Sequence, residues 1–409
     1  IGVMKMLKKK QWIAAALCLS LVFGGCAAGG NEDKEEKPSE QTEEQEAPKK
    51  PAYQAKLDVI EPAAYGNAEG LKLEKGSYIS IIGKGEEGQY WKQVKKGVDR
   101  AAKDLNVQLG YEGKDKIKVV YSAPAETDNV DEQVNLLDEE LSRYPVALGI
   151  AIVDENACDV QFDLAADSEI PIVAFDSGSD YQGLMATVST NNSESAQVVA
   201  DNLGKELEGT GEIVVVANDS KSKNNKERVN AFAAKLQESY PEISIVDTVY
   251  LDALDSWQEQ IAAEINAGTY ALSGEPTGTA LSEETQVDPK SITEEQVLDY
   301  VLKKHPNLKG VYGTNQVAVK ALVEGIERGE REGLKVVGYD ADEEQLQMLK
   351  DGTVDGLVVQ NPFGMGYASV IAAARAAIGA GNEAYVNTGY VWVTKDNMKK
   401  EEVKQMLAE

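Results

Sequence analysis

Short hydrophobic runs alternate with amphipathic stretches along most of the chain. The run from Tyr78 to Ile82 is typical of a buried strand, and the stretch from Tyr90 to Leu105 carries its apolar residues on one face of a helix. The same alternation predicts strands at 78–82, 117–121, 146–153, 170–175, 212–217, 243–250, 308–312, 334–339, 354–360 and 385–393. It predicts helices at 90–105, 130–141, 159–166, 193–207, 225–238, 257–266, 294–304, 317–327, 343–349 and 365–378. Repeated strand–helix units of this length indicate an α/β fold with parallel sheets covered on both faces.

The strand–helix series restarts near residue 190, which predicts two doubly wound parallel-sheet lobes. We expect a three-segment hinge to join them. The expected N-terminal lobe comprises 76–189 and 361–387, and the expected C-terminal lobe comprises 190–360 and 388–409. The expected crossings between the lobes lie near Ser189–Thr190, Gln360–Asn361 and Asn387–Tyr390.

Two segments lack the alternating pattern. Residues 26–75 begin with a stretch of Glu, Lys, Gln and Pro that cannot bury enough apolar surface to offset its ordering entropy. We expect a flexible tether there, followed by an extended lead-in at 53–75. Residues 269–292 are rich in Gly, Ser, Thr and Glu and contain Pro276 and Pro289, so we expect an inserted surface loop.

The first 25 residues have the order of a secretory signal, with a basic start, an apolar run from Trp12 to Phe23, and small residues before Cys26. The apolar run is shorter than the roughly 20 residues that a membrane span requires. We therefore expect residues 1–25 to be a lipoprotein signal peptide and Cys26 to be lipidated, anchoring the protein to the outer face of the cell membrane. A plain signal peptide is the alternative.

The formal net charge of −28 at pH 7 disfavours nucleic acid as a partner, because phosphate binding is dominated by Lys and Arg. It also disfavours broad docking on anionic lipid, so we expect membrane contact through the lipid anchor only. We expect a monomer that carries no cofactor.

The sequence offers little for catalysis. His305 is the only histidine and is predicted at a surface helix end. Without a second histidine, we expect neither a Ser–His pair nor an ordinary metal cluster. Cys158 has no nearby histidine and is expected to be a buried small hydrophobe. We expect no metal site and no enzyme activity, although Asp176 and Asp340 would suit a carboxylate-pair enzyme as well as a binding cleft.

Residues 83–88 spell G-x-G-x-x-G between a predicted strand and a predicted helix, which is the dinucleotide-binding fingerprint. Glu86 and Glu87 would repel a pyrophosphate there. The next predicted strand ends at Tyr121–Ser122, without a carboxylate for a ribose. An NAD-dependent oxidoreductase is therefore a minor alternative.

Ligands of open α/β sheets bind outside the carboxyl ends of the strands. Here those ends carry Asp176, Asn315, Asp340 and Gln360, whose side chains can form paired hydrogen bonds with hydroxyl groups. Lys84, at the end of the first strand, is expected to be a solvated loop charge. The pattern predicts an interlobe cleft for a small polyhydroxylated ligand.

Several stretches also form a recognisable series. They are Gln89-Tyr90-Trp91 with Gly97 and Ala101-Ala102, Val173–Asp176, Ser189–Asn192, Glu227-Arg228 with Phe232, Gly313–Asn315, Val336–Asp340, Gln360–Pro362 and Met365–Tyr367. In this order they resemble the sugar-binding family of periplasmic-type binding proteins typified by ribose-binding protein, over roughly residues 77–395. The resemblance implies an extracytoplasmic or periplasmic solute-binding protein that captures a sugar or polyol and delivers it to an ABC transporter permease. A sensor that presents the bound ligand to a receptor or kinase is the alternative.

The resemblance also implies a set of ligand contacts. Tyr90 and Trp91 would pack against the apolar face of a sugar ring. The other implied contacts are Asp176, Thr190, Arg228, Asn315, Tyr339, Asp340 and Gln360. Ser177 and Ala151 stand where ribose binders carry Arg and Asn, which argues against ribose itself and leaves another sugar, a cyclitol or a small polyol open.

Overall fold

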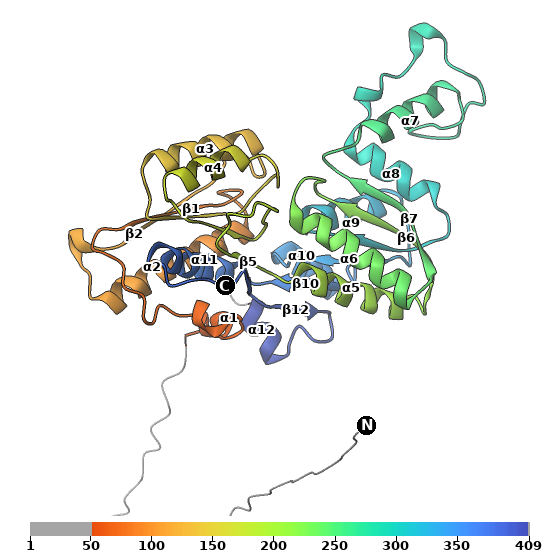
Figure 1. The fold of residues 1–409 in the computed structure, drawn as a ribbon. Helices are drawn as coiled ribbons and strands as arrows, with labels where there is room; N and C mark the ends of the chain where they lie inside the picture. Colours follow the sequence, from red (N-terminus) through yellow and green to blue (C-terminus); the bar gives the residue numbers. More distant parts are fainter. Residues whose placement is uncertain (1–50, 408–409) are drawn as a thin grey trace, which may run out of the picture. The chain divides into compact units, whose positions relative to one another are not determined.

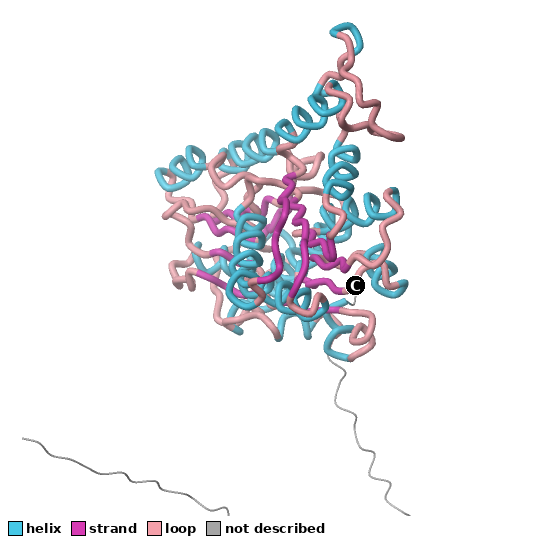
Figure 2. Tube along the Cα trace, turned by 90° about the vertical axis from the view of Figure 1, so that its right-hand side faces the viewer, coloured by secondary structure: helices cyan, strands magenta, loops and turns pink. Residues whose placement is uncertain are grey.

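The computed structural model describes residues 51–407. The predicted signal peptide, Cys26 and the predicted tether up to residue 50 lie outside the described residues. Within 51–407 the chain forms two sheets whose faces are covered by helices, as Figures 1 and 2 show. The predicted pair of doubly wound α/β lobes is therefore confirmed.

The N-terminal sheet has the strand order β11-β5-β4-β3-β1-β2, and its paired strands are parallel. Its strands are β1 (Tyr78–Ile82), β2 (Lys118–Ser122), β3 (Ala147–Ile150), β4 (Ile172–Phe175), β5 (Thr187–Ser189) and β11 (Tyr385–Asn387). One face packs on α2 (Gln89–Leu109) and α11 (Pro362–Ala377), and the other on α3 (Val130–Ser142) and α4 (Asp159–Asp167). Buried strands such as β3 and β4 are continuously apolar, as strands covered on both faces require.

The C-terminal sheet has the matching order β12-β10-β9-β8-β6-β7. Its strands are β6 (Thr210–Ala217), β7 (Glu242–Tyr250), β8 (Leu308–Gly313), β9 (Lys335–Tyr339), β10 (Gly356–Gln360) and β12 (Tyr390–Val393). Its helices are α5 (Asn192–Glu206), α6 (Lys223–Ser239), α7 (Asp255–Asn266), α8 (Glu294–Lys304), α9 (Gln316–Arg328), α10 (Glu343–Asp351) and α12 (Glu401–Leu407). Only β12 runs antiparallel to its neighbour, β10, among the described strands.

The chain passes between the two sheets at the three predicted places. β5 leads through Thr190 to α5, and β10 leads through Asn361 to α11. The third crossing corrects one prediction, because the single strand expected at 385–393 is two strands on different sheets. Gly389, in the left-handed conformation with φ of 78°, separates β11 from β12 and lets the chain change sheet.

The extended lead-in predicted at 53–75 is wrong. This segment contains helix α1 (Gln54–Asp58) and a 3₁₀ turn at Ala63–Tyr65, and Leu57, Ile60 and Tyr65 are buried in the core of the N-terminal lobe. The segment also contacts the hinge. The side chain of Asn361 donates to the backbone oxygens of Lys56 (2.7 Å) and Thr388 (2.8 Å). Local hydrophobic periodicity is too weak in so short a segment to reveal this packing.

Residues 267–293 interrupt the C-terminal lobe between α7 and α8, where the sequence predicted an inserted loop. They contain 3₁₀ turns at Glu283–Thr285 and Pro289–Ser291 and project beyond the two helices in Figure 1. The segment ends at a capping box in which the side chains of Thr293 and Gln296 each bond to the other residue's backbone N–H, which fixes the start of α8.

Close packing between α2 and α11 fixes the helix that carries Tyr90 and Trp91. A Cβ atom added at Gly97 would lie 2.0 Å from the backbone oxygen of Phe363, and one added at Gly366 would lie 2.0 Å from that of Val94. The two helices can approach this closely only because both positions are glycine.

We expect Gly97→Ala to lower the free energy of unfolding by about 1–3 kcal/mol, because overpacking forces α2 and α11 apart. Urea unfolding of the full chain measures this change. Gly329→Ala is the matched control, since Gly329 lies at the end of α9 with an ordinary φ of −81° and the nearest atom to an added Cβ is 3.3 Å away. A Gly97→Ala variant as stable as the control would contradict this account of the helix pair.

Candidate functional site

A cavity of about 270 Å³ lies at the carboxyl ends of strands from both sheets. In each sheet the strand order reverses once, between β1 and β3 in one lobe and between β6 and β8 in the other. Loops diverge at such switch points and leave a crevice beyond the strand ends. The cavity is lined by Lys84, Glu87, Gly88, Tyr90, Trp91, Thr127, Asp128, Asp176, Asn218, Asp219, Asn224, Asn225, Arg228, Asn315, Gln316, Val317, Asp340 and Gln360.

Asp176 and Asp340 occupy equivalent positions in the two lobes. Each follows a strand end, β4 or β9, with a positive φ (59° and 70°), and each backbone N–H donates to the neighbouring strand. Asp tolerates this conformation better than most residues. The structure thus brings both predicted carboxylates to one cavity, one from each lobe.

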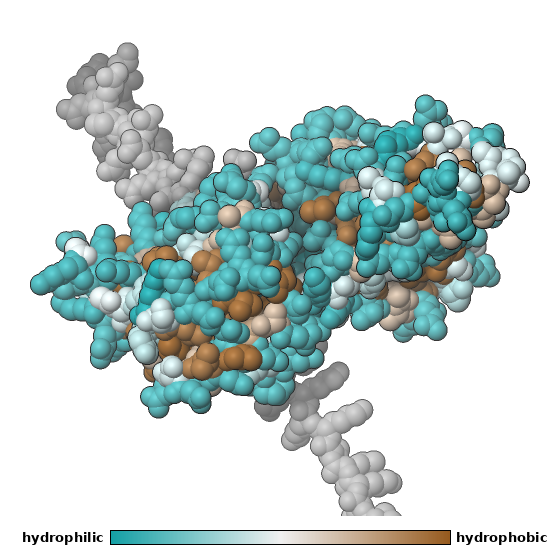
Figure 3. Space-filling model, turned by 90° about the horizontal axis from the view of Figure 1, so that it is seen from above, coloured by the Kyte–Doolittle hydropathy of each residue, from teal (hydrophilic) through white to brown (hydrophobic). Residues whose placement is uncertain are grey.

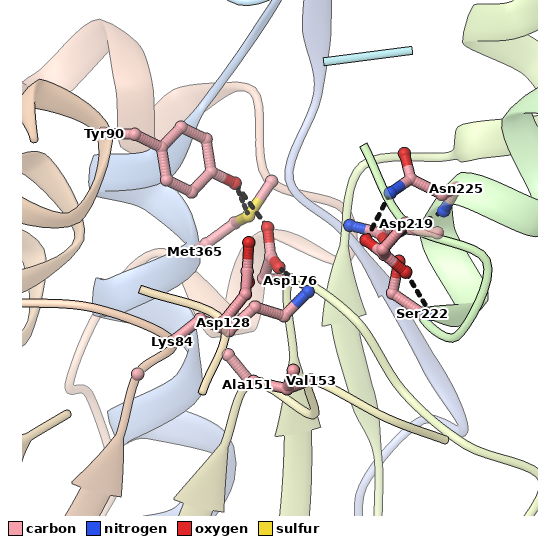
Figure 4. A network of polar contacts seen from close by, with 12 residues as sticks. Lys84, Tyr90, Asp128, Ala151, Val153, Asp176, Asp219, Ser222, Asn225 and Met365 are labelled. Atoms are coloured by element: carbon pink, nitrogen blue, oxygen red, sulfur yellow. Dashed lines mark hydrogen bonds and ion pairs between the residues drawn. The ribbon is translucent and has the colours of Figure 1, made fainter. Parts of the chain in front are cut away.

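Lys84 is not the solvated charge that the sequence predicted. Only 5% of the residue is exposed, and its ammonium nitrogen lies 3.3 Å from Asp176 Oδ2, as Figure 4 shows. Burial alone would lower the pKa of Lys84, but the carboxylates of Asp176, Asp128 and Asp219 outweigh burial and raise it. Lys84 is therefore a charged member of the cavity wall.

Tyr90 and Trp91 begin helix α2 and both line the cavity. Their rings meet edge to face with centroids 5.2 Å apart. The Tyr90 hydroxyl donates to Asp176 Oδ1 (2.6 Å), and burial beside Asp176 raises its pKa well above the ordinary value. Trp91 packs mainly in the core of the N-terminal lobe, with 8% of its surface exposed. Tyr90 consequently offers the larger share of the aromatic surface.

Arg228 is held in a fixed orientation by acceptors on three different elements. Its Nε donates to Asn192 Oδ1 (2.9 Å), its Nη1 to the backbone oxygen of Thr314 (2.8 Å), and its Nη2 to Gln360 Oε1 (2.8 Å). The guanidinium also lies over the ring of Tyr339, 4.1 Å from its centroid. Burial acts to lower the pKa of Arg228, yet negative charge including that of Asp340 outweighs it and keeps the group protonated.

Two predicted contacts, Thr190 and Tyr339, do not line the cavity. Thr190 is buried at the first crossing and donates to Gln360 Oε1 (2.9 Å), while Gln360 Nε2 donates to Asp340 Oδ1 (2.8 Å). Tyr339 is buried beneath Arg228, and its hydroxyl lies 2.7 Å from Ser195 Oγ. Successive strand residues point to opposite faces, so Tyr339 faces away from the edge that Asp340 reaches. Both residues support cavity residues from behind.

Asn315 lies on the cavity wall as predicted, and its side chain also caps α9 by accepting from the backbone N–H of Ala318 (3.0 Å). The cavity is also lined by residues that were not predicted from the sequence, namely Asp128, Asp219, Asn218, Asn224 and Asn225. Asn218 and Asp219 directly follow β6, so the strand-end rule applied to that strand would have found them. Asp128 lies in a longer loop after β2 and carried no signal in the sequence.

The two lobes touch each other at the edge of the cavity. Asn218 Nδ2 lies 3.2 Å from Asp128 Oδ2, and Lys226 Nζ lies 2.6 Å from Glu155 Oε1. Asp219 stays on its own lobe, where the side chains of Ser222 and Asn225 donate to it (Figure 4). The structure therefore shows the lobes in contact at the edge of a polar cleft.

Two of the three glycines of the 83–88 motif have a packing explanation, and the third, Gly88, adopts a positive φ of 87°. A Cβ added at Gly83 would lie 2.0 Å from the hydroxyl oxygen of Tyr121, and one added at Gly85 would lie 2.4 Å from Thr127 Oγ1. The Tyr121 hydroxyl donates to the backbone oxygen of Gly85 (2.9 Å). Gly83 and Gly85 therefore allow this loop to pack closely against Tyr121 and Thr127. Packing and backbone conformation account for the pattern without a dinucleotide.

Gln133 organises the strand ends around Ala151. Its side chain donates to the backbone oxygens of Gly83 (3.0 Å) and Ala151 (2.7 Å) and accepts from the N–H of Val153 (3.0 Å). The first and third strand ends are thus joined from below by one buried amide. The backbone groups next to the apolar Ala151 therefore have hydrogen-bond partners in the Gln133 side chain.

Other reactive groups lie apart from the cavity. His305 ends α8 and contacts Asp247, and Cys158 is buried, which raises its thiol pKa to about 12. Among residues 51–407 there is no cluster of His, Cys, Asp and Glu suited to a metal ion, and no helix long and apolar enough to cross a membrane. The face of the molecule in Figure 3 is mostly hydrophilic.

Asp128 provides a pH-dependent test of the charge arrangement. Burial raises its pKa, Lys84 opposes the rise, and Asp219 and Asp176 add to it. A raised folded-state pKa contributes stability below pH about 4 that is lost as pH rises through that pKa. We expect Asp128→Asn to raise the thermal midpoint of the ligand-free protein at pH 7 and to have little effect at pH 4. Asn also tolerates the φ of 64°.

Glu126→Gln, at an exposed position in the same loop, is the control and should leave the midpoint unchanged at both pH values. A lower midpoint for Asp128→Asn at pH 7 would show that Lys84 needs the charge of Asp128, contrary to this account.

Comparison with known proteins agrees with this architecture. The family model described as a periplasmic binding protein domain matches residues 79–381. The D-ribose/D-allose-binding protein of Pseudomonas aeruginosa is 24% identical over 247 residues, which are 59% of this chain and 66% of that protein.

Two solved structures are similar to this chain over most of its length. A carbohydrate-transporter solute-binding protein of Agrobacterium radiobacter, solved with D-arabinose, has a TM-score of 0.65 at 25% identity, covering 81% of this chain and 98% of that one. A glucose-galactose-binding protein of Geobacillus stearothermophilus has the same fold, with a TM-score of 0.64 at 20% identity, covering 80% and 100%. With the family model matched along most of its length, this chain belongs to the periplasmic binding protein family.

Proposed function

We propose that this protein is an extracytoplasmic solute-binding lipoprotein that captures a sugar or small polyol and delivers it to an ABC importer. The observation that carries the proposal is the single cavity on which Asp176, Arg228, Asn315, Asp340 and Gln360 converge beside Tyr90. Carboxylates accept from hydroxyls, amides both donate and accept, and the phenol ring suits the C–H face of a sugar.

The proposed role requires binding and release without chemistry. Ligand contacts on both lobes would stabilise their closed arrangement, and the three crossings would serve as the hinge. The closed form would be the one that the permease recognises. Solute binding in the relatives named above supports this role, and the cavity charges described here already have partners within the protein. We therefore propose that the protein is not an enzyme. We also propose that Cys26 carries the lipid that keeps the protein at the membrane.

The residues behind the cavity have a proposed positioning role. Thr190 and Arg228 both donate to Gln360 Oε1, which leaves the Gln360 amide nitrogen directed at Asp340. Gln360 ends β10 next to the second crossing. A ligand bound to Asp340 would therefore contact a network that includes two of the three crossings.

The full chain should bind at least one sugar when its thermal midpoint is screened against aldopentoses, aldohexoses, cyclitols, nucleosides and amino acids. Calorimetric titration of the best ligand then gives its affinity. Asp340→Asn should weaken that affinity by about 10–100-fold, because hydrogen bonds to a charged acceptor contribute about 1.5–3 kcal/mol.

Glu343→Gln is the control, since Glu343 is exposed in the first turn of α10 and does not line the cavity. Binding of amino acids or nucleosides, with no response to any sugar or cyclitol, would contradict the proposed function.

A further inference from the structure

A second cavity of about 270 Å³ adjoins the first. We call the cavity described above the inner cavity and this one the outer cavity. Their shared wall consists of Thr127, Asp128, Asn218, Asp219 and Val317. The outer cavity is otherwise lined by Val130, Val153, Lys221, Leu251, Asp252 and Glu294, again from both lobes.

The boundary between the two cavities is weakly closed. Asn218 and Asp128 line both, and the hydrogen bond between their side chains is long, at 3.2 Å. Val317, in the first turn of α9, also lines both and is 50% exposed, so its apolar surface is available to a ligand. A ligand that extended from one cavity to the other would cover Val317 and pass the contact between Asn218 and Asp128.

Three residues of the outer cavity lie beside α7 and α8, the helices that the inserted segment connects. Leu251 and Asp252 follow β7 on the way to α7, and Glu294 is the first residue of α8. The capping box at Thr293 holds that first turn in place. The outer cavity is therefore bordered by the part of the C-terminal lobe where the strand–helix series is interrupted.

The chemistry of the outer cavity suits a second hydroxylated ring. Val130, Val153 and Leu251 provide apolar surface, while Asn218, Lys221 and Asp252 provide donors and acceptors. Four carboxylates face one lysine there, namely Asp128, Asp219, Asp252 and Glu294 against Lys221. This excess of negative charge disfavours an anionic substituent.

We propose that the ligand is a disaccharide, with one ring in the inner cavity and the second in the outer cavity. This inference rests on the proposed function, because it assumes that the inner cavity binds a sugar. The volume of the inner cavity alone is just below the roughly 300–1,000 Å³ that is usual for small-molecule sites. The outer cavity has the same volume, so a ligand that spans both has a site within that range.

A pair of neighbouring variants tests the outer cavity. Glu294 and Glu295 are both exposed in the first turn of α8, but only Glu294 lines the cavity. Glu294→Trp should fill the outer cavity, and Glu295→Trp should not. The full chain and both variants would be titrated calorimetrically with neutral disaccharides and with the monosaccharides that compose them.

We expect the unmodified chain to bind one disaccharide at least tenfold more tightly than either of its monosaccharides. Glu294→Trp should weaken the disaccharide at least tenfold and leave monosaccharide affinity within twofold, whereas Glu295→Trp should change neither. Monosaccharides that bind as tightly as any disaccharide, or a disaccharide affinity unchanged in Glu294→Trp, would overturn the inference and leave the proposed function standing. Failure of every mono- and disaccharide to bind the unmodified chain would overturn both.

Discussion

A buried guanidinium must direct its N–H groups at acceptors, and this requirement at Arg228 fixes the geometry of the cleft. Only 2% of Arg228 is exposed, and its acceptors belong to the first helix after the β5 crossing, the end of β8 and the end of β10. An unpaired buried charge would cost several kcal/mol, so these elements must keep their relative positions. The acceptor on β10, Gln360, in turn orients Asp340. The polar wall of the C-terminal lobe and two hinge crossings are thus parts of one network.

The N-terminal lobe meets the same requirement with a different cation. Lys84 is buried against Asp176, which also accepts from Tyr90, so charge and aromatic surface are fixed together. Each lobe therefore presents an aspartate with partners inside the protein: Asp176 pairs with Lys84, and Asp340 accepts from Gln360 Nε2 and from the backbone N–H of Gln316. A hydroxylated ligand can bond to both aspartates without adding charge to the cleft. This is the physical reason why the cleft suits a neutral polyol better than an anion.

The sequence predicted what local patterns determine and missed what distant partners determine. Hydrophobic periodicity located both lobes, and the strand-end rule located Asp176, Asn315, Asp340 and Gln360 on the cavity wall. Lys84 was misjudged because its carboxylate partner is supplied by β4, far along the chain. The packing of 53–75 was missed because its few apolar residues gain their burial from the lobe core and α11. Tyr339 was misjudged because strand alternation turns it toward Arg228.

Both lobes are proposed to bind one hydroxylated ligand between Tyr90 and Arg228. A crystal structure of the full chain with its tightest-binding sugar tests this most directly. We expect a sugar ring beside Tyr90, with hydroxyl oxygens about 2.5–3.0 Å from carboxylate oxygens of Asp176 and Asp340. Sugar bound to one lobe alone, or outside the cavity with both carboxylates uncontacted, would contradict it.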